Sequence, residues 1–368
     1  MGGGAGSLIG IVHRIAGVMG DDYQLVGGVF NTDPTVSREF ALDLQLDPSR
    51  VYANVDDFIV GEQALPDAKR VKLVTVATPN HVHYEMARKL IEGGFHVICE
   101  KPVTTTTVQA MNLEKLLKAR KLIFAVAYTY TGYPMVRQMR AMIENDAIGR
   151  VQRVDVQYYQ GWINTVIHDL ASRAGVWRLD PERGGQSCCI GDIGVHAFNL
   201  LEYTTGLRVQ RVLADINTLY ADNALDVDAS VLVQMDSGAK GVVRTSQIAT
   251  GEENNLQLAV YGRTGALKWA QEEPNQLEFL QADKPLAVFK PGHAFILPLA
   301  REATKLPAGH PEGLIDAMGN IYKGVARAIN GLPGNAGDYP DISAGVRGMR
   351  FMEAVLASAH AGSTWIPV

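Results

Sequence analysis

The sequence predicts an α/β protein with an added α+β part: a doubly wound parallel sheet comes first, and an open, mainly antiparallel sheet with helices follows. Over residues 1–125, apolar strand-like runs alternate with helical segments, as in a parallel sheet covered by helices on both faces. Over residues 126–368, segments of alternating apolar and polar residues follow one another between turns, which is typical of antiparallel strands with one covered face. We therefore predict two domains with these bounds.

Length and composition agree with an ordinary globular protein of two domains. The chain has 368 residues, 47 % of them hydrophobic and 20 % charged, and its formal net charge of −5 gives no support for a nucleic-acid or membrane partner. The three cysteines, Cys99, Cys188 and Cys189, lie in apolar stretches and form neither a disulfide framework nor a metal-ligand spacing. The N-terminus lacks a signal-peptide pattern, and no apolar run has the length of a membrane span. We therefore expect a cytoplasmic protein with a small-molecule partner and no metal.

Strands and helices alternate in order through the first part. The strand runs are apolar on both faces and stop at turn residues or proline, whereas the helical segments carry apolar residues at helical spacing. Strands are predicted over 23–31, 71–79, 95–102 and 122–130. Helices are predicted over 8–19, 37–46, 56–65, 81–94 and 108–121.

A glycine-rich stretch opens the chain. Gly2, Gly4 and Ser7 have the spacing G-x-G-x-x-[GA], with Gly6 between them, and a predicted helix follows directly. Such a loop lets a pyrophosphate approach the backbone and the helix N-terminus, as in Rossmann domains. The alternative is a flexible glycine-rich terminus. Because only Met1 precedes the glycines, we expect that residues of a first strand are missing upstream.

The end of the predicted strand 23–31 bears on the choice of dinucleotide. A carboxylate there favours NAD, and a nearby Arg accommodates the 2′-phosphate of NADP. Asn31 stands at the expected acidic position, Asp33 is suited to cap the next helix, and Arg38 lies in that helix. These residues leave NAD and NADP open, with a slight lean to NADP.

Two longer patterns are more specific. They are ATPNHVHYEMARKLIEGGFHVICEKP at residues 77–102 and GDIGVHAFNL at residues 191–200. Together they resemble the glucose–fructose oxidoreductase / inositol dehydrogenase family, known as Gfo/Idh/MocA. The resemblance covers nearly the whole chain and includes WRLDPERGG at 177–185, YGRTGALKW at 261–269 and the ending STWIPV.

The resemblance implies a cofactor site at the carboxyl ends of the strands and a catalytic set of three residues. To the glycine loop, Asn31 and Arg38 it adds residues that line the nicotinamide side: Thr78, Pro79, Asn80, His83, Glu100 and Lys101. In family members the lysine of the E-K-P signature faces both nicotinamide and substrate, and a D-x-x-x-H pair completes the site. In this sequence those positions are Lys101, Asp192 and His196.

The chemistry of these residues agrees with that assignment. Lys101 follows a predicted parallel strand, where open α/β sheets bind ligands. Asp192 and His196 are four residues apart, so on the predicted apolar helix 184–203 they share an inward face. Burying polar groups on such a face costs free energy, which favours a functional role for them. Each residue also has a purely structural alternative. Glu100 and Lys101 would be solvated charges in a loop, Asp192 would cap the helix, and His196 would be a buried residue with its hydrogen bonds satisfied. Either Lys101 or His196 is suited to act as the base.

The second part supplies the expected substrate site. Strands are predicted over 150–160, 209–221, 226–238, 239–250, 254–265 and 265–273, and helices over about 311–330 and 343–360. Trp162 and Arg178, from the segment before the Asp–His helix, and Tyr130 are candidate substrate contacts together with Asp192 and His196. The free sheet face is expected to form a homodimer or homotetramer, and the last helix to pack back on the first domain.

We therefore predict an NAD(P)-dependent dehydrogenase that acts on a secondary alcohol or ketone of a sugar, polyol or derivative. Two alternatives remain: an NAD-dependent glycosidase-like hydrolase, and a non-catalytic NAD(P)-sensing regulator on the same fold. The particular substrate and the direction of the reaction stay open.

Overall fold

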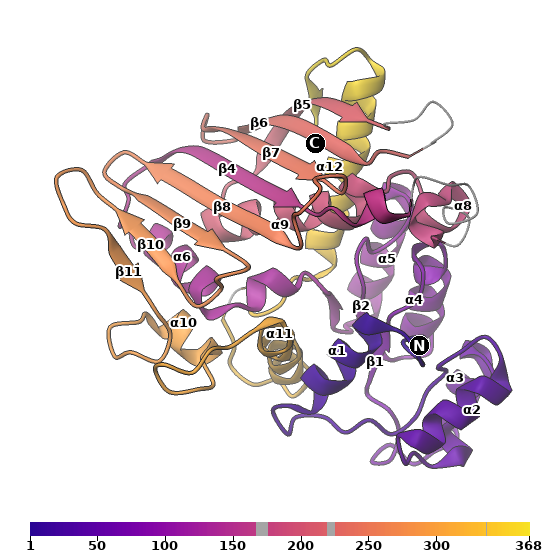
Figure 1. The fold of residues 1–368 in the computed structure, drawn as a ribbon. Helices are drawn as coiled ribbons and strands as arrows, with labels where there is room; N and C mark the ends of the chain where they lie inside the picture. Colours follow the sequence, from indigo (N-terminus) through magenta and orange to yellow (C-terminus); the bar gives the residue numbers. More distant parts are fainter. Residues whose placement is uncertain (167–175, 219–224, 336) are drawn as a thin grey trace.

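The computed structural model describes residues 1–166, 176–218, 225–335 and 337–368. It has a smaller N-terminal part with a parallel sheet and a larger part in which one broad sheet is backed by helices (Figure 1). The parallel sheet has the order β1-β2-β3. Its strands are β1 (Leu73–Val76), β2 (His96–Cys99) and β3 (Phe124–Val126).

The sheet extends beyond β1 through single bridges. Gly2 bridges Ala77 in parallel and its amide donates to the Val29 carbonyl, while Gly28 bridges Val51. The strand predicted over 23–31 therefore contributes only an isolated bridge. A cavity of about 360 Å³ lies beside Met1 and is lined by residues 22–28 and 68–75.

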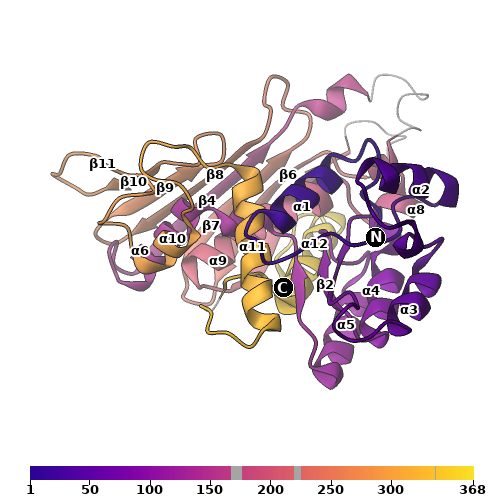
Figure 2. The ribbon, with the colours of Figure 1, turned by 90° about the horizontal axis from the view of Figure 1, so that it is seen from below.

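Helices cover both faces of this sheet. α4 (His83–Glu92) and α5 (Thr107–Arg120) lie on one side, and α1 (Leu8–Val18) lies on the other beside α11 (Leu314–Ile329), as Figure 2 shows. Val12 and Ala16 of α1 pack with Met318 and Tyr322 of α11 in one buried cluster. α12 (Ile342–His360) packs against α5 and β3. Two C-terminal helices thus complete the first domain and join it to the second. The two remaining helices of this part are α2 (Pro34–Asp43) and α3 (Val55–Gln63).

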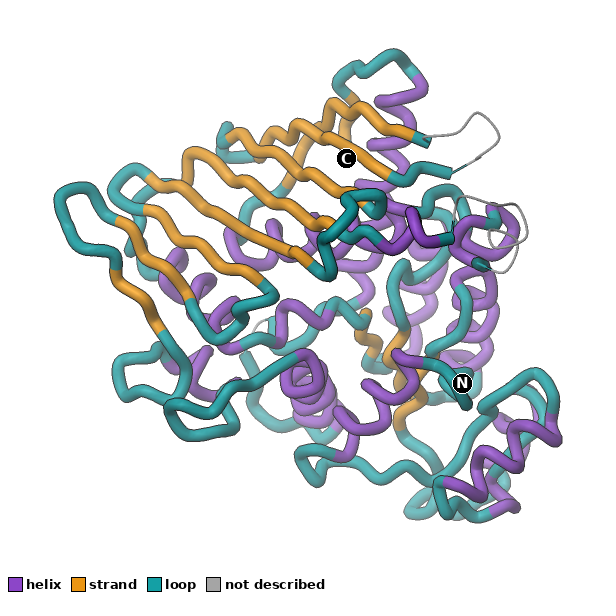
Figure 3. Tube along the Cα trace, viewed as in Figure 1, coloured by secondary structure: helices purple, strands orange, loops and turns teal. Residues whose placement is uncertain are grey.

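The second sheet has nine strands in the order β11-β10-β9-β8-β4-β7-β6-β5-β12, and every neighbouring pair is antiparallel except β4 and β7. Buried and exposed residues alternate along β6 because one face packs on helices such as α9 and the other is open (Figure 3). The strands are β4 (Val151–Tyr159), β5 (Val209–Asn217), β6 (Asp228–Met235), β7 (Lys240–Ser246), β8 (Asn255–Gly262), β9 (Ala266–Ala270), β10 (Leu277–Leu280), β11 (Ala287–Phe289) and β12 (Ile366–Pro367). This confirms the mainly antiparallel sheet.

Some predicted elements need correction. In the apolar helix predicted over 184–203, Gly184 ends a separate short helix, α8 (Pro181–Gly184), and residues 185–188 are not helical. The helix begins at Cys189 with a π-helical turn, η6 (Ile190–Gly194), and continues as α9 (Val195–Thr205). The strand predicted over 209–221 ends at Asn217, and residues 219–221 lie outside the described part. The sequence analysis did not anticipate α6 (Pro134–Glu144), α10 (Pro298–Ala303), β10, β11 or β12. Within the described residues, the helices are too short or too polar to cross a membrane.

Candidate active site

The glycine loop packs closely against its neighbours. A side chain at Gly4 would place Cβ 2.4 Å from the Phe30 carbonyl oxygen, and one at Gly10 would place Cβ 2.2 Å from that of Gly3. Ser7 caps α1 by accepting a hydrogen bond of 3.1 Å from the Gly10 amide. The close helix contact that the third glycine of such a loop permits therefore falls at Gly10, which the sequence analysis did not single out. Gly6 has open space beside it.

Asn31 lies exposed at the end of the segment that pairs with Gly2. Its Oδ1 accepts a hydrogen bond of 3.0 Å from the Asp33 amide, and Asp33 in turn caps α2 through the Thr35 amide at 2.8 Å. Asp33 therefore serves the next helix. Arg38 is exposed on α2.

The loop after β1 connects the two domains. Asn80 is buried and donates a hydrogen bond of 2.8 Å to the Gly184 carbonyl, which belongs to the second part of the chain. His83 is fully buried, and its ring nitrogens lie 2.8 Å from the carbonyl oxygens of Thr78 and Pro102, so it ties this loop to the loop after β2. Burial lowers the pKa of His83. Pro79 precedes the short helix η2 (Asn80–Val82).

Glu100 is held from behind by a buried chain of hydrogen bonds. His13 Nε2 of α1 lies 2.9 Å from Glu100 Oε1, and His13 Nδ1 lies 2.9 Å from the Tyr322 hydroxyl of α11. Burial would raise the pKa of Glu100, but the hydrogen bond and charge of His13 outweigh it and the pKa lies below its ordinary value. His13 was not among the sequence candidates. It belongs to α1, and only tertiary packing brings it to the E-K-P segment.

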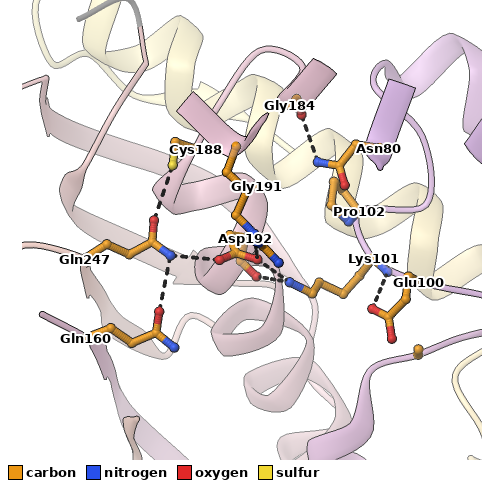
Figure 4. A network of polar contacts seen from close by, with 12 residues as sticks. Asn80, Glu100, Lys101, Pro102, Gln160, Gly184, Cys188, Gly191, Asp192 and Gln247 are labelled. Atoms are coloured by element: carbon orange, nitrogen blue, oxygen red, sulfur yellow. Dashed lines mark hydrogen bonds and ion pairs between the residues drawn. The ribbon is translucent and has the colours of Figure 1, made fainter. Parts of the chain in front are cut away.

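Lys101 and Asp192 meet at the junction of the two domains (Figure 4). Lys101 Nζ donates to Asp192 Oδ1 at 2.6 Å and to the Asp192 carbonyl at 2.8 Å, and Arg178 Nε lies 3.4 Å from the same Oδ1. Burial would raise the pKa of Asp192, yet Lys101 and Arg178 hold it well below its ordinary value. Asp192 is therefore ionised, and the two nearby cations keep it so.

His196 lies in an aromatic pocket beside this charged pair. The ring of Tyr130 stands edge-on at 4.9 Å and that of Tyr128 at 5.6 Å. Burial lowers the pKa of His196 to about 3, and the charge of Lys101 adds to the effect. The imidazole is thus neutral, and its buried Nδ1 has no hydrogen-bond partner within the described residues.

The other substrate candidates lie around this centre. The Tyr130 hydroxyl is hydrogen-bonded to the Tyr158 hydroxyl, and the Trp162 indole donates to Gln160 Oε1 at 3.1 Å. Arg178 also stacks on Trp177, with its guanidinium carbon 4.5 Å from the ring centroid. The rest of the expected substrate segment, residues 167–175 with His168, lies outside the described residues.

The structure thus gathers the three residues Lys101, Asp192 and His196 but arranges them differently from a simple helix face. Asp192 sits in the π-helical turn, a local widening frequent at functional sites. Among the described contacts, Asp192 bonds to Lys101, Arg178 and Gln247, and none of its hydrogen bonds goes to His196.

Two family models match this chain. Residues 4–128 match the family described as "Oxidoreductase family, NAD-binding Rossmann fold", and residues 136–268 match the "GFO/IDH/MocA C-terminal domain". The chain belongs to the Gfo/Idh/MocA family. It is an NAD(P)-dependent oxidoreductase whose relatives include sugar and polyol dehydrogenases.

Individual members of the Gfo/Idh/MocA family resemble the chain over most or all of its length. An uncharacterised oxidoreductase, YfiI, from Bacillus subtilis is 32 % identical and covers 100 % of this chain and 95 % of its own. The crystal structure of an inositol dehydrogenase homologue from Azotobacter vinelandii, complexed with NAD+, is 33 % identical with a TM-score of 0.92, covering 100 % of this chain and 96 % of that one. A levoglucosan dehydrogenase from Pseudarthrobacter phenanthrenivorans is 24 % identical over 83 % of this chain and 82 % of its own.

The residues present fit the dinucleotide of a Gfo/Idh/MocA protein. Gly4 and Gly10 are buried, and their lack of side chains lets the loop pack closely at the N-terminus of α1. A helix N-terminus at the end of such a loop suits a pyrophosphate. Thr78 Oγ1, at the carboxyl end of β1, is buried without a hydrogen-bond partner in the described chain. Over the same residues, no group of three or more His, Cys, Asp or Glu side chains is placed to hold a metal ion.

Proposed function

We propose that this protein is a dehydrogenase that transfers a hydride between nicotinamide and a secondary alcohol or ketone of a sugar, polyol or derivative. The observation that carries the proposal is the Lys101–Asp192 pair, 2.6 Å apart at the domain junction, with the neutral ring of His196 nearby. A fixed cation and a neutral imidazole are the two groups that alcohol oxidation needs: one binds the oxygen and one accepts its proton.

The roles of the residues follow from their charges. The bound nicotinamide supplies the hydride acceptor or donor. Lys101, paired with Asp192, donates a hydrogen bond to the reacting oxygen and stabilises the negative charge that develops on it. His196 is neutral and takes the hydroxyl proton, while Asp192 orients Lys101. Exchange of the base role between His196 and Lys101 is the alternative, and it predicts a different pH profile for each variant.

The cofactor and substrate contacts extend from this centre. We propose that the cofactor contacts are the glycine loop (Gly2, Gly4, Gly6, Ser7), Asn31, Arg38, Thr78, Pro79, Asn80, His83, Glu100 and Lys101. Tyr130, Trp162 and Arg178 complete the substrate side. Tyr130 contributes its ring, because its hydroxyl is bonded to Tyr158.

We infer that the cofactor is NAD or NADP, with NADP slightly favoured. Asn31 carries no charge that would repel a 2′-phosphate, and Arg38 lies on the helix that follows. The homologue from Azotobacter vinelandii is complexed with NAD+. The kcat/KM values of this protein should therefore be measured with both NAD and NADP. Asn31→Asp should shift the ratio of kcat/KM values toward NAD about tenfold.

We also propose a homodimer or homotetramer formed through the open face of the large sheet. That face exposes Leu232 of β6 at 45 %, and such a broad sheet surface needs a cover. A cytoplasmic location fits the three buried free cysteines.

One screen tests the function against its rivals. The purified protein is incubated with NAD or NADP and a panel of cyclic polyols, sugars and glycosides, while absorbance at the reduced-nicotinamide band and sugar release are both followed. A dehydrogenase reduces the cofactor with one class of polyol or sugar. Release of sugar from a glycoside without net reduction would identify the glycosidase-like alternative, and cofactor binding without either reaction would identify a regulator.

A further inference from the structure

Gln247 is a buried amide that touches the candidate active site from the large sheet. It directly follows β7, and its side chain points to Asp192 between Cys188 and Gln160 (Figure 4). Gln247 Nε2 donates to Asp192 Oδ2 at 2.8 Å and to Gln160 Oε1 at 3.3 Å. Its Oε1 accepts from Cys188 Sγ at 3.4 Å. We propose that Gln247 is a positioning residue: it fixes the Asp192 carboxylate, which holds Lys101 in place for the reaction. This inference rests on the proposed function.

The orientation of the Gln247 amide is determined by its partners. An ionised carboxylate only accepts hydrogen bonds, so the atom that faces Asp192 must be Nε2. The Trp162 indole only donates, so the atom of Gln160 that it reaches, 3.1 Å away, must be Oε1, which leaves a second acceptor site for Gln247. The positions of the oxygen and nitrogen atoms in both side-chain amides are thus assigned consistently, from Asp192 on one side and from Trp162 on the other.

The two oxygens of Asp192 have separate tasks. Oδ1 faces the cations Lys101 and Arg178, whereas Oδ2 faces the neutral amide of Gln247. Without that donor the carboxylate is held through Oδ1 alone among its described contacts, so it turns more easily about its Cβ–Cγ bond. The ammonium group paired with Oδ1 then shifts relative to the Asp192 carbonyl, its other acceptor. Even a small displacement of a group that contacts the reacting atoms is enough to slow the chemical step.

The backbone of Gln247 is itself fixed on both sides. Its amide donates to the Val227 carbonyl at 2.9 Å, and its carbonyl accepts from the Ile163 amide at 3.1 Å. The side chain therefore starts from a rigid part of the second domain and reaches, through Asp192, the lysine of the first domain. A residue that only fills the core would not require this directed donor.

Gln247→Glu separates positioning from filling, because it keeps the size and changes one group. At low pH a protonated carboxyl donates an O–H to Asp192 as the amide donates its N–H. At higher pH two carboxylates would face each other at hydrogen-bond distance, which is unfavourable, so the pair retains one proton up to a raised pKa. Activity and stability of this variant should therefore both fall as the pH rises through that pKa.

The experiment compares Gln247→Glu and Gln247→Met with the wild type. The control is Gln63→Glu, the same change on α3, where the side chain is exposed and donates only to the Gly93 carbonyl among the described contacts. For each protein, kcat and KM are measured with the substrate found in the screen between about pH 5 and pH 8, together with cofactor Kd and Tm.

We expect Gln247→Met to lose about 10- to 100-fold in kcat at every pH, with cofactor Kd changed less than about twofold. Gln247→Glu should approach the wild type near the acid end and lose about tenfold or more in kcat, with a falling Tm, toward the alkaline end. Profiles of Gln247→Glu that run parallel to those of the wild type and Gln63→Glu would overturn the inference. Since Tm needs no substrate, a wild type inactive in the screen would reject the proposed function while the Tm profile still decides the contact.

Discussion

The two halves of the candidate site solve different physical problems. In one half, Lys101 and Asp192 are paired charges, and every oxygen of the carboxylate has a donor. In the other half, His196 is a neutral ring among tyrosines, with Nδ1 left without a partner in the described structure. The fixed charges of Lys101 and Asp192 are therefore separate from the ring of His196 that accepts a proton. The first half holds an oxygen and the second receives a proton.

Removing the cation from the charged half should have the largest effect. We predict that Lys101→Met lowers kcat/KM on the order of 10³-fold or more, because the reacting oxygen loses both its hydrogen bond and its positive charge. Steady-state absorbance of the reduced nicotinamide measures the rate. Cofactor Kd should stay within about threefold, since the glycine loop is untouched.

A control is needed because, among the described residues, the variant leaves Asp192 with the half-exposed Arg178 as its one cation. Lys101→Met combined with Asp192→Asn removes both charges, so it should recover stability in urea without recovering turnover. Turnover near the wild-type rate in either variant would break the assignment of Lys101.

The second prediction addresses the neutral half. His196→Gln should lower kcat about 10²-fold, because the amide keeps polarity and approximate size but cannot take the hydroxyl proton. Its KM should change little. If His196→Gln keeps the maximal kcat and changes only the alkaline limb of the plot of kcat against pH, Lys101 would be favoured as the base. The roles assigned to the two halves of the site would then be exchanged.

The neutrality of His196 also predicts how stability depends on pH. Its pKa is about 3 in the folded protein against an ordinary value of 6.5, so the unfolded chain binds more protons between these values. The free energy of unfolding should therefore be fully present above about pH 6.5 and fall by up to ~1.4 kcal/mol per pH unit below it for each such histidine. Urea unfolding at two pH values measures this slope, which should be shallower in His196→Gln. His83, whose pKa is also lowered, leaves a residual slope. An unchanged slope would contradict a buried neutral His196.

The smallest effect is expected at the rim of the charged half. Arg178 has a side chain 40 % exposed and lies 3.4 Å from Asp192, so its pairing is weak compared with that of Lys101. Arg178→Ala should raise KM about two- to fivefold and leave kcat nearly unchanged. A loss as large as that of Lys101→Met would make Arg178 part of the catalytic centre.

Local patterns in the sequence predicted the parts of the site that neighbouring residues define. Unbroken apolar runs predicted β1, β2 and β3, and the segment that ends in Lys101 follows one of them directly. Alternation predicted β4 to β9 because one face of that sheet is covered by helices. The D-x-x-x-H pair of the family predicted Asp192 and His196, although it gave no sign of the π-helical turn that contains Asp192.

The remainder depends on contacts between distant segments. His13 reaches Glu100 from 87 residues away, and Gln247 reaches Asp192 from 55 residues away. A single His in an amphipathic helix or a Gln after a strand has no local feature that marks such a contact. The short strands β10 to β12 carry too few residues to show a period. α6, by contrast, has apolar and polar residues at helical spacing, a signal that the prediction from sequence did not use.

The most direct test is a single-turnover reaction with a substrate that carries deuterium on the reacting carbon, with excess protein and oxidised cofactor. We predict that the deuterium appears at C4 of the reduced nicotinamide, and that Lys101→Met slows this step about 10³-fold at saturating substrate and cofactor. Reduced cofactor without deuterium would contradict hydride transfer from the substrate, and transfer at the same rate in Lys101→Met would contradict the role of the charged half of the site.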